Sequence, residues 1–386
     1  MTRTVSAYSI SRESQEAAKD LIQQITAKIS HPNAVMVFLS AQHTHSIILA
    51  ELTNRFPEAE IVGCSSAGEF DSTGRGEGSA SAFAIESSEM AFHASMATGL
   101  SGAPEAAGRH LLSTFRGSKD DRYRYRAAMI LNDALAGSAD ELVRTLYMET
   151  GGKYKFFGGG AGDDAAFSKT YVFCGTEVAT DAVIALEILS TKPIGVGVRH
   201  GWSPATEPMR VTESKANVVG SLDAVTTAEV FEQHAEMTGQ YLNRDAPLPF
   251  FLHNIAGMKL ENGYKLRVPL GIVSNGSVSF AAEVPEGSTI SIMNATATSS
   301  MEAAVDAASD AMRQLGDFKA GGALMFDCVA TRLRLGKDFG DEIDAVQRVV
   351  GDVALAGCNT YGQVATTEDQ SAGFHNCNAV VCVFPE

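Results

Sequence analysis

The chain has 386 residues, more than one hydrophobic core usually supports, so two domains are expected. Hydrophobic residues make up 45% of it and charged residues 20%, proportions that are ordinary for a globular protein in water. The net charge of −16 argues against nucleic acid or an anionic membrane surface as a partner, because both attract clustered positive charge.

The sequence shows no sign of export or membrane insertion. Residues Met1–Ser14 contain no apolar stretch of signal-peptide length, and no apolar run approaches the length of a membrane span. We therefore expect a cytoplasmic protein without a membrane partner.

Three stretches of the chain follow the same order of predicted elements. In each, a short apolar run typical of a strand covered on both faces precedes a helix and a second strand. That second strand ends in a glycine-rich turn, and one or two further strands follow. The first strands are Ala34–Leu39, Ala127–Leu131 and Ala323–Asp327, and a helix over Glu13–Ile29 precedes them all. This weak internal repeat predicts related strand–helix–strand units.

Between the second and third stretches the pattern changes. From Pro247 to Asn294, short alternating runs are separated by Asn-Gly turns at Asn262 and Asn275, which is typical of antiparallel β structure. The predicted fold class is therefore α/β, with mixed α+β character. It has repeated strand–helix–strand units with glycine-rich turns and an antiparallel β region in the C-terminal half. A domain boundary is expected near Val225.

The three glycine turns close on Glu69, Asp163 and Gln363. Open α/β sheets bind ligands at such strand ends, because backbone N–H groups converge there. Chain reversal alone would also explain the glycines. The turn G-G-G-A-G-D-D is not a phosphate loop, since it lacks the G-K-[ST] ending and carries acidic residues. From the residues alone, scaffold and pocket lining both remain open.

The six cysteines are scattered without a C-x-x-C pair, and most lie inside apolar runs, where a thiol behaves as a small hydrophobic group. Cys64 and Ser65 stand on the first glycine turn. A nucleophile there would make the protein a Cys- or Ser-dependent hydrolase, which also needs a histidine and an oxyanion hole. The sequence assigns neither, and the hydrolase is kept as the alternative function.

The nine histidines show no metal-ligand spacing, so no metal site is predicted. His375 lies between a polar loop and the last apolar run, and His200 lies two residues before the only tryptophan. A hydrogen-bonded structural role suits both histidines. Either could instead be the axial ligand of a haem, which would be non-covalent because C-x-x-C-H is missing.

Several motifs, in this order along the chain, resemble those of FIST sensory proteins. The turns V-G-C-S-S-A-G-E (62–69) and F-G-G-G-A-G-D-D (157–164) are similar to those of the FIST N-terminal domain. H-G-W-S-P with V-T-E-S-K-A-N-V-V-G-S-L-D-A (200–224) resembles the junction with the C-terminal domain. V-P-E-G-S-T-I-S-I-M (284–293), C-N-T-Y-G-Q-V and G-F-H-N (358–376) resemble parts of that domain. Two departures are Gln363-Val364, where the family commonly has Glu-Ile, and Thr206–Met209, which replaces the usual V-G.

The resemblance implies an N-terminal strand and helix in residues 1–30, a FIST N-terminal domain in 31–224 and a FIST C-terminal domain in 225–386. It implies a cytoplasmic signal-transduction sensor, not an enzyme, which binds an amino acid or similar small molecule, or haem with nitric oxide as the signal. The signal would pass to a separate histidine kinase or cyclic-di-nucleotide signalling enzyme, and a homodimer is an open option. His375, or failing that His200, would hold the haem. The predicted ligand-binding residues are Cys64, Ser65, Ser66, Glu69, Asp163, Asn359, Tyr361, Phe374, His375 and Asn376.

Overall fold

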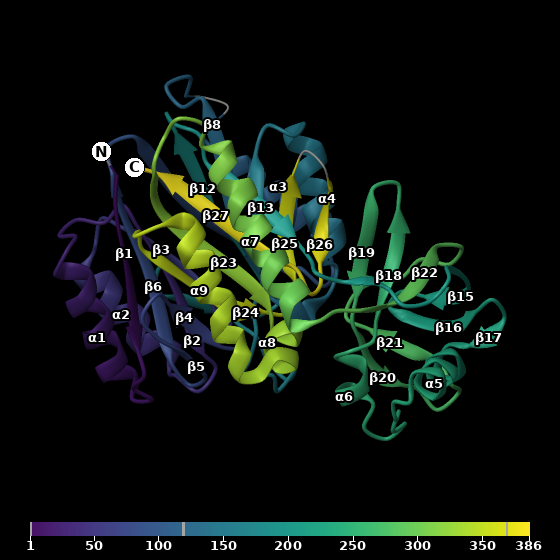
Figure 1. Cartoon of the computed structure of the whole chain (residues 1–386). Coiled ribbons are helices and arrows are strands. Elements are labelled where there is room, and N and C mark those ends of the chain that lie inside the picture. Colours follow the sequence, from purple (N-terminus) through teal and green to yellow (C-terminus); the bar gives the residue numbers. More distant parts are fainter. Residues whose placement is uncertain (1, 118–119, 368–369) are drawn as a thin grey trace.

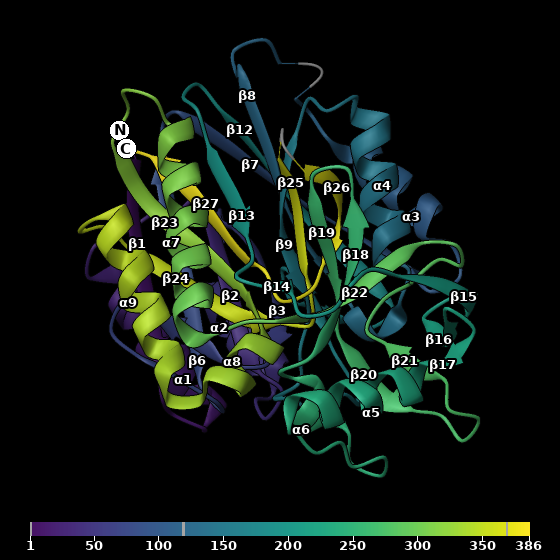
Figure 2. The same ribbon diagram turned by 45° about the vertical axis from the view of Figure 1, so that its right-hand side comes forward.

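The computed structural model describes residues 2–117, 120–367 and 370–386, and in them the chain builds three units of one design (Figures 1 and 2). Each unit runs strand, helix, strand, helix, strand, short hairpin, strand. Unit 1 comprises β1 (Thr2–Ser9), α1 (Ser14–Thr26), β2 (Ala34–Ser40), α2 (His45–Arg55), β3 (Glu60–Ser66), β4 (Glu69–Asp71), β5 (Arg75–Gly76) and β6 (Ala80–Ser87). Unit 2 comprises β7 (Met90–Thr98), α3 (Pro104–Thr114), β8 (Tyr125–Asn132), α4 (Ala139–Thr150), β9 (Lys155–Gly160), β10 (Val172–Cys174), β11 (Glu177–Ala179) and β12 (Ala182–Ser190).

Unit 3 follows the same order but contains two additions. Its elements are β13 (Gly195–Arg199), α7 (Ala297–Gln314), β23 (Ala320–Cys328), α8 (Val329–Leu335), α9 (Phe339–Val350), β24 (Leu355–Thr360), β25 (Gln363–Thr367), β26 (Gln370–His375) and β27 (Ala379–Pro385). The first addition is α8, a short helix between β23 and α9. The second is a separate antiparallel sheet inserted between β13 and α7.

The inserted sheet lies to one side of the three units (Figure 1). It has its own apolar core, which includes Val211, Phe231, Phe251, Phe280 and Ile292. Its elements are β14 (Ser203–Pro204), β15 (Met209–Lys215), β16 (Val218–Leu222), β17 (Val225–Thr226), α5 (Thr227–Thr238), α6 (Leu248–Phe251), β18 (Ile255–Leu260), β19 (Gly263–Arg267), β20 (Pro269–Ile272), β21 (Val278–Phe280) and β22 (Thr289–Asn294). The predicted fold class, repeated units plus an antiparallel β region in the C-terminal half, is confirmed.

The three units exchange their hairpins in a closed cycle. The hairpin of unit 1 pairs through β4 with β24 of unit 3, that of unit 2 pairs through β10 with β3 of unit 1, and that of unit 3 pairs through β25 with β9 of unit 2. Each sheet is therefore completed by a neighbouring unit. Since each glycine turn lies between a central strand and the exchanged hairpin, all three turns must cross from one sheet to the next.

The faces of the three sheets that point away from the helices pack together in a shared core. Phe38 of unit 1 lies edge-to-face on Phe326 of unit 3, with ring centroids 5.5 Å apart, and Phe157 of unit 2 lies 6.3 Å from Phe326. Helices cover the outer faces, α1 and α2 on the first sheet and α3 and α4 on the second. Helices α7 and α9 cover the third. A core shared by all three units holds the strand ends of the glycine turns close to one another.

Candidate functional site

The three glycine turns touch one another through their backbones. The N–H of Ala67 donates to the Asn359 carbonyl, that of Tyr361 to the Gly160 carbonyl, and that of Gly162 to the Ser65 carbonyl, each at 2.9 Å. These bonds join unit 1 to unit 3, unit 3 to unit 2, and unit 2 to unit 1. The turns therefore form one closed ring of contacts, and their side chains are brought to a common region.

Glu69, which closes the first turn, is buried and accepts hydrogen bonds from two serines. Its carboxyl group binds the Ser66 hydroxyl and both the hydroxyl and the N–H of Ser79, at 2.7 and 3.2 Å. Burial raises its pKa to about 8, and these hydrogen bonds only partly oppose the shift. At pH 7 this side chain is therefore mostly neutral.

Asp163, which closes the second turn, anchors the loop after it. Burial alone would raise its pKa, but hydrogen bonds from the Tyr361 hydroxyl and from backbone N–H groups of the loop hold the pKa below its usual value. The Tyr361 ring stacks on Phe167, with centroids 4.4 Å apart. Gln363, which closes the third turn, donates to the Thr360 hydroxyl at 2.9 Å. Both Asp163 and Gln363 are bound within the protein.

A cavity of about 340 Å³ opens beside the first and third turns, where the hairpin of unit 1 meets α8 and α9. We call it the polar cavity. Glu69 and Asn359 line it together with Glu77, Arg332 and Lys337, and the other lining residues are Phe70, Arg75, Gly76, Gly336, Phe339 and Gly340.

The polar cavity is distinguished by donors that lack acceptors. Nε and one terminal nitrogen of Arg332, and Nδ2 of Asn359, are buried without a hydrogen-bond partner in the described part of the chain. Asn359 is 1% exposed, and the Arg332 side chain is 16% exposed. The two residues flank Gly68, because a methyl group there would lie 2.8 Å from Asn359 Oδ1 and 3.2 Å from Arg332 Nε. Buried donors are normally satisfied, so this arrangement is suited to an acceptor group supplied by a ligand.

Positive charge prevails in the polar cavity. Arg332 forms an ion pair with Glu77, while Arg75 donates to the Gly340 carbonyl at 3.1 Å and lies 3.5 Å from Asp344. Lys337 adds a further cation, and Glu69 is mostly neutral at pH 7. An anionic or zwitterionic ligand would complement these groups.

A second cavity, of about 80 Å³, lies between the three units and the inserted sheet, and we call it the junction cavity. Tyr361, Gly362 and Asn376 line it from the glycine-turn side, and Val268 and Leu270 line it from the inserted sheet. Most of its other lining side chains are apolar. Asn359 and Tyr361 are two residues apart in one turn, so this turn separates the polar cavity from the junction cavity.

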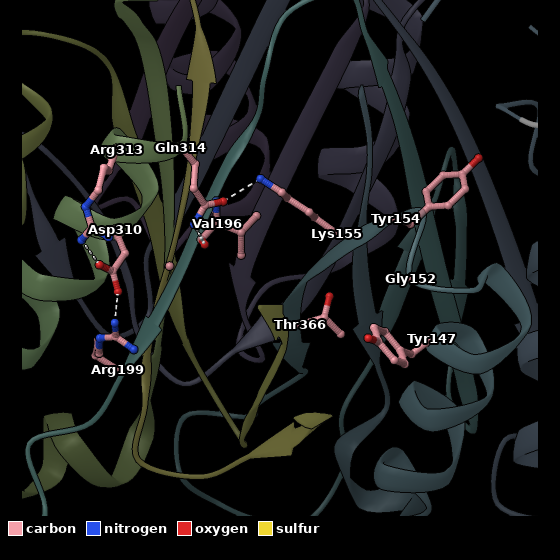
Figure 3. Close-up of a pocket in the computed structure, with 11 residues that line it drawn as sticks. Tyr147, Gly152, Tyr154, Lys155, Val196, Arg199, Asp310, Arg313, Gln314 and Thr366 are labelled. Carbon is pink, nitrogen blue, oxygen red and sulfur yellow. Dashed lines mark hydrogen bonds and ion pairs between the residues drawn. The ribbon is translucent and has the colours of Figure 1, made fainter. Parts of the chain in front are cut away.

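A third cavity, of about 260 Å³, lies between units 2 and 3, and its polar side chains bind one another (Figure 3). Lys155 Nζ donates to Gln314 Oε1 at 2.6 Å, and Asp310 forms ion pairs with both Arg199 and Arg313. A fourth, of about 480 Å³, lies beside β7, α3 and β11. The polar cavity differs from this third cavity because buried N–H donors on two of its lining residues have no hydrogen-bond partner in the described part of the chain.

Two family models match consecutive regions of the chain, and the boundary between the matches falls within the inserted sheet. A model of the FIST N domain matches residues 33–225, and a model of the FIST C domain matches residues 228–366. The chain belongs to the FIST family. FIST domains indicate a sensor of small ligands in signal transduction.

Other comparisons add little. Among curated proteins, none matches the chain. Two solved structures of cyanuric acid hydrolase, one of them from A. caulinodans, are 8% and 10% identical to it, with a TM-score of 0.36 for both. The alignments cover 99% of each chain for the A. caulinodans enzyme and 100% of each for the other. At these values the likeness carries no argument about this FIST protein. Across the described ranges, no helix is long and apolar enough to cross a membrane.

The residues of the hydrolase alternative lie inside the protein. Cys64 is 0% exposed within the shared core, and the Ser65 hydroxyl accepts the N–H of Tyr171 at 2.9 Å. Neither lines any of the four cavities. A nucleophile must reach its substrate, so this placement does not favour a hydrolase.

The two candidate haem ligands are also buried or bound. His200 Nε2 lies 3.2 Å from the Tyr264 carbonyl oxygen, and Nδ1 accepts the Trp202 N–H at 3.3 Å. Burial and the nearby Lys265 lower the pKa of His375 to about 3. Its Nε2 lacks a partner among the described residues, yet neither histidine lines any of the four cavities. As placed, these residues do not fit a haem, which needs an imidazole facing a large cavity.

The structure thus separates the predicted ligand residues. Glu69 and Asn359 meet in the polar cavity, and Tyr361 and Asn376 meet in the junction cavity. The other six predicted residues line none of the four cavities, namely Cys64, Ser65, Ser66, Asp163, Phe374 and His375. Sequence reasoning missed Arg332, and the available signal was the pair of arginines in R-L-R-L (332–335), which begins four residues after the end of a buried strand.

Proposed function

We propose that this FIST protein is a cytoplasmic sensor whose polar cavity binds an amino acid with an acidic side chain. The observation that carries the proposal is the set of buried donors without acceptors on Arg332 and Asn359. The family membership supports a small ligand, and the cavity residues indicate which chemical class it belongs to.

The α-carboxylate of the ligand is assigned to Arg332 and Asn359. An arginine presents its Nε and terminal nitrogens in a planar fork that matches two carboxylate oxygens. The side chain of Asn359 contributes one more N–H donor through Nδ2. Gly68 lies between Asn359, which faces it through Oδ1, and Arg332, which faces it through Nε, so the two side chains that carry these donors meet at one short stretch of backbone.

The remaining charges of the cavity select the rest of the ligand. Glu77 is the carboxylate available to the α-ammonium group, since Glu69 is mostly neutral at pH 7. Lys337 is then assigned to a second carboxylate, and Arg75, which also contacts Gly340 and Asp344, adds positive charge on that side of the cavity. We therefore expect L-glutamate and L-aspartate to bind more tightly than the uncharged L-glutamine and L-asparagine.

In this proposal the protein binds its ligand without transforming it. The signal passes to a separate protein, for which a histidine kinase or a cyclic-di-nucleotide signalling enzyme is the expected class. The proposal assigns no role to haem, because the two candidate histidines line none of the four cavities.

Thermal shift and calorimetry with the full chain test the ligand class. At a concentration of about 100 times its Kd, a ligand that binds only the folded state adds about 2.7 kcal/mol to the free energy of unfolding. This raises the melting temperature by an amount that is readily measured. Arg332→Met keeps the length of the side chain and removes the fork. We expect a loss of about 3 kcal/mol of binding free energy, or about a hundredfold in Kd.

The matched control is Arg348→Met, which removes an exposed arginine from α9 with the same change of net charge. It should bind as the wild type does. Equal binding by Arg332→Met would remove Arg332 from the site. If none of the amino acids produces a shift or heat, the proposed function is wrong. Equal affinity for L-glutamate and L-glutamine would overturn only the preference for an acidic side chain.

A further inference from the structure

Helix α8 faces two parts of the molecule at once. It spans only Val329–Leu335, and Arg332 and Arg334 are two residues apart, which places them about 200° apart around the helix axis. Arg332 lines the polar cavity, and Arg334 points to the connections of the inserted sheet. In Figures 1 and 2, α8 lies on the side of the three units that faces the inserted sheet.

Arg334 holds both chain connections between the units and the inserted sheet. Its guanidinium lies over the Trp202 ring, 5.1 Å from the centroid, and Trp202 directly precedes β14. It also donates to the Ala295 carbonyl at 3.3 Å, and Ala295 directly follows β22. A further hydrogen bond joins it to the Ser300 hydroxyl on α7. One side chain of α8 therefore joins the point where the chain enters the inserted sheet to the point where it leaves.

The remaining contacts of α8 reinforce this link. Val329, Ala330 and Leu333 line the junction cavity, opposite Val268 and Leu270 of the inserted sheet. The helix is followed directly by Gly336, which has a φ of +57° and also lines the polar cavity. A displacement of α8 would therefore alter both cavities and both chain connections.

We propose that α8 transmits occupancy of the polar cavity to the inserted sheet. This relay rests on the proposed function, because it requires a ligand on Arg332. A ligand carboxylate favours the position of α8 in which the Arg332 fork is fully bound, and a ligand shifts an equilibrium only by such a difference in affinity. Arg334 moves with the same helix, so it carries the shift to Trp202 and Ala295. The inserted sheet then changes its position against the three units.

Trp202 makes the relay measurable, because it is the only tryptophan of the chain and lines none of the four cavities. Saturating L-glutamate should change the tryptophan emission of the wild type and the hydrogen exchange of peptides covering β14 and β22. In Arg334→Met, binding measured by calorimetry should stay within about threefold of the wild type, while both responses are lost. Arg332→Met should lose binding and responses together, and Arg348→Met should keep both.

Ser300→Ala is a milder variant that removes one partner of Arg334 and keeps its contact with Trp202. It should bind normally and respond with reduced amplitude, so the test does not depend on the folding of Arg334→Met. Calorimetric binding of L-glutamate with unchanged emission and exchange would overturn the relay and leave the proposed function standing. A full response in Arg334→Met would also overturn it. Absence of binding to the wild type would overturn the proposed function, and the relay with it.

Discussion

Asp140 ties the inserted sheet to unit 2 and carries the clearest prediction about stability. It lies in the first turn of α4, and its carboxylate binds Lys265 Nζ and one terminal nitrogen of Arg267, each at 2.5 Å. It also accepts the N–H of Phe374 at 3.1 Å. Arg267 is 1% exposed, so its charge is balanced mainly by this carboxylate. The pKa of Asp140 is below its ordinary value, although burial opposes the shift, because Arg267 and Lys265 stabilise the charged form.

Asp140→Asn would keep the shape of the side chain and remove its charge. The buried Arg267 and the half-buried Lys265 would then lie together, and Glu283 would be the remaining negative charge that acts on both of them. Removing one partner of a buried ion pair lowers the free energy of unfolding by about 3–5 kcal/mol. Since the Asp140 side chain retains 23% exposure, we expect the lower end of that range, about 3 kcal/mol. Since the free energy of unfolding falls by about 1–3 kcal/mol for each M of urea, the urea concentration at the unfolding midpoint should fall by about 1–3 M.

Trp202 lies at the junction with the inserted sheet, so its fluorescence during urea unfolding is the appropriate signal. Asp341→Asn is the matched control, because it removes an exposed aspartate from the first turn of α9. The difference between the two variants should persist at about 0.5 M salt, since buried pairs are screened far less than exposed ones. Equal midpoints for the two variants would refute the importance of this ion pair.

Three further predictions concern Glu69, Gly63 and the cysteines. The pKa of Glu69 rises from 4.5 to about 8 on folding, so between these pH values the folded state binds one more proton than the unfolded state. The free energy of unfolding therefore falls as pH rises from about 4.5 to about 8. In Glu69→Gln, unfolding measured at a series of pH values should lack this dependence of stability on pH. Gly63→Ala should abolish soluble protein, because its methyl group would lie 1.8 Å from a carbonyl oxygen of β2, whereas Gly102→Ala, with space around it, should be tolerated. Cys174, the one half-buried cysteine among the six, should react first with a thiol reagent, and faster labelling of Cys64 would instead favour the hydrolase.

The repeated strands and turns were predictable because their signals are local. Ala34–Leu39, Ala127–Leu131 and Ala323–Asp327 are apolar runs that need only their own residues to indicate buried strands. The exchange of hairpins was not predictable in the same way. Strands such as β4 and β10 have three residues each, and their partners lie in other units. Pairing over such distances depends on the assembled core, which no short window of sequence contains.

The candidate site could be predicted only in part, because its unpartnered donors lie where the third unit departs from the repeat. Asn359 occupies the turn position that Ser65 and Gly159 hold in the other units, so its amide is an addition of unit 3. Arg332 comes from α8, while the corresponding connections are the four residues 41–44 in unit 1 and, in unit 2, a segment with a 3₁₀ turn at Ala134–Ala136. The inserted sheet is likewise confined to unit 3. The strands and turns recur in all three units. Among the described residues, however, Arg332, Asn359 and the link to the inserted sheet belong to unit 3, and this unequal unit is where ligand binding and its consequence should be sought.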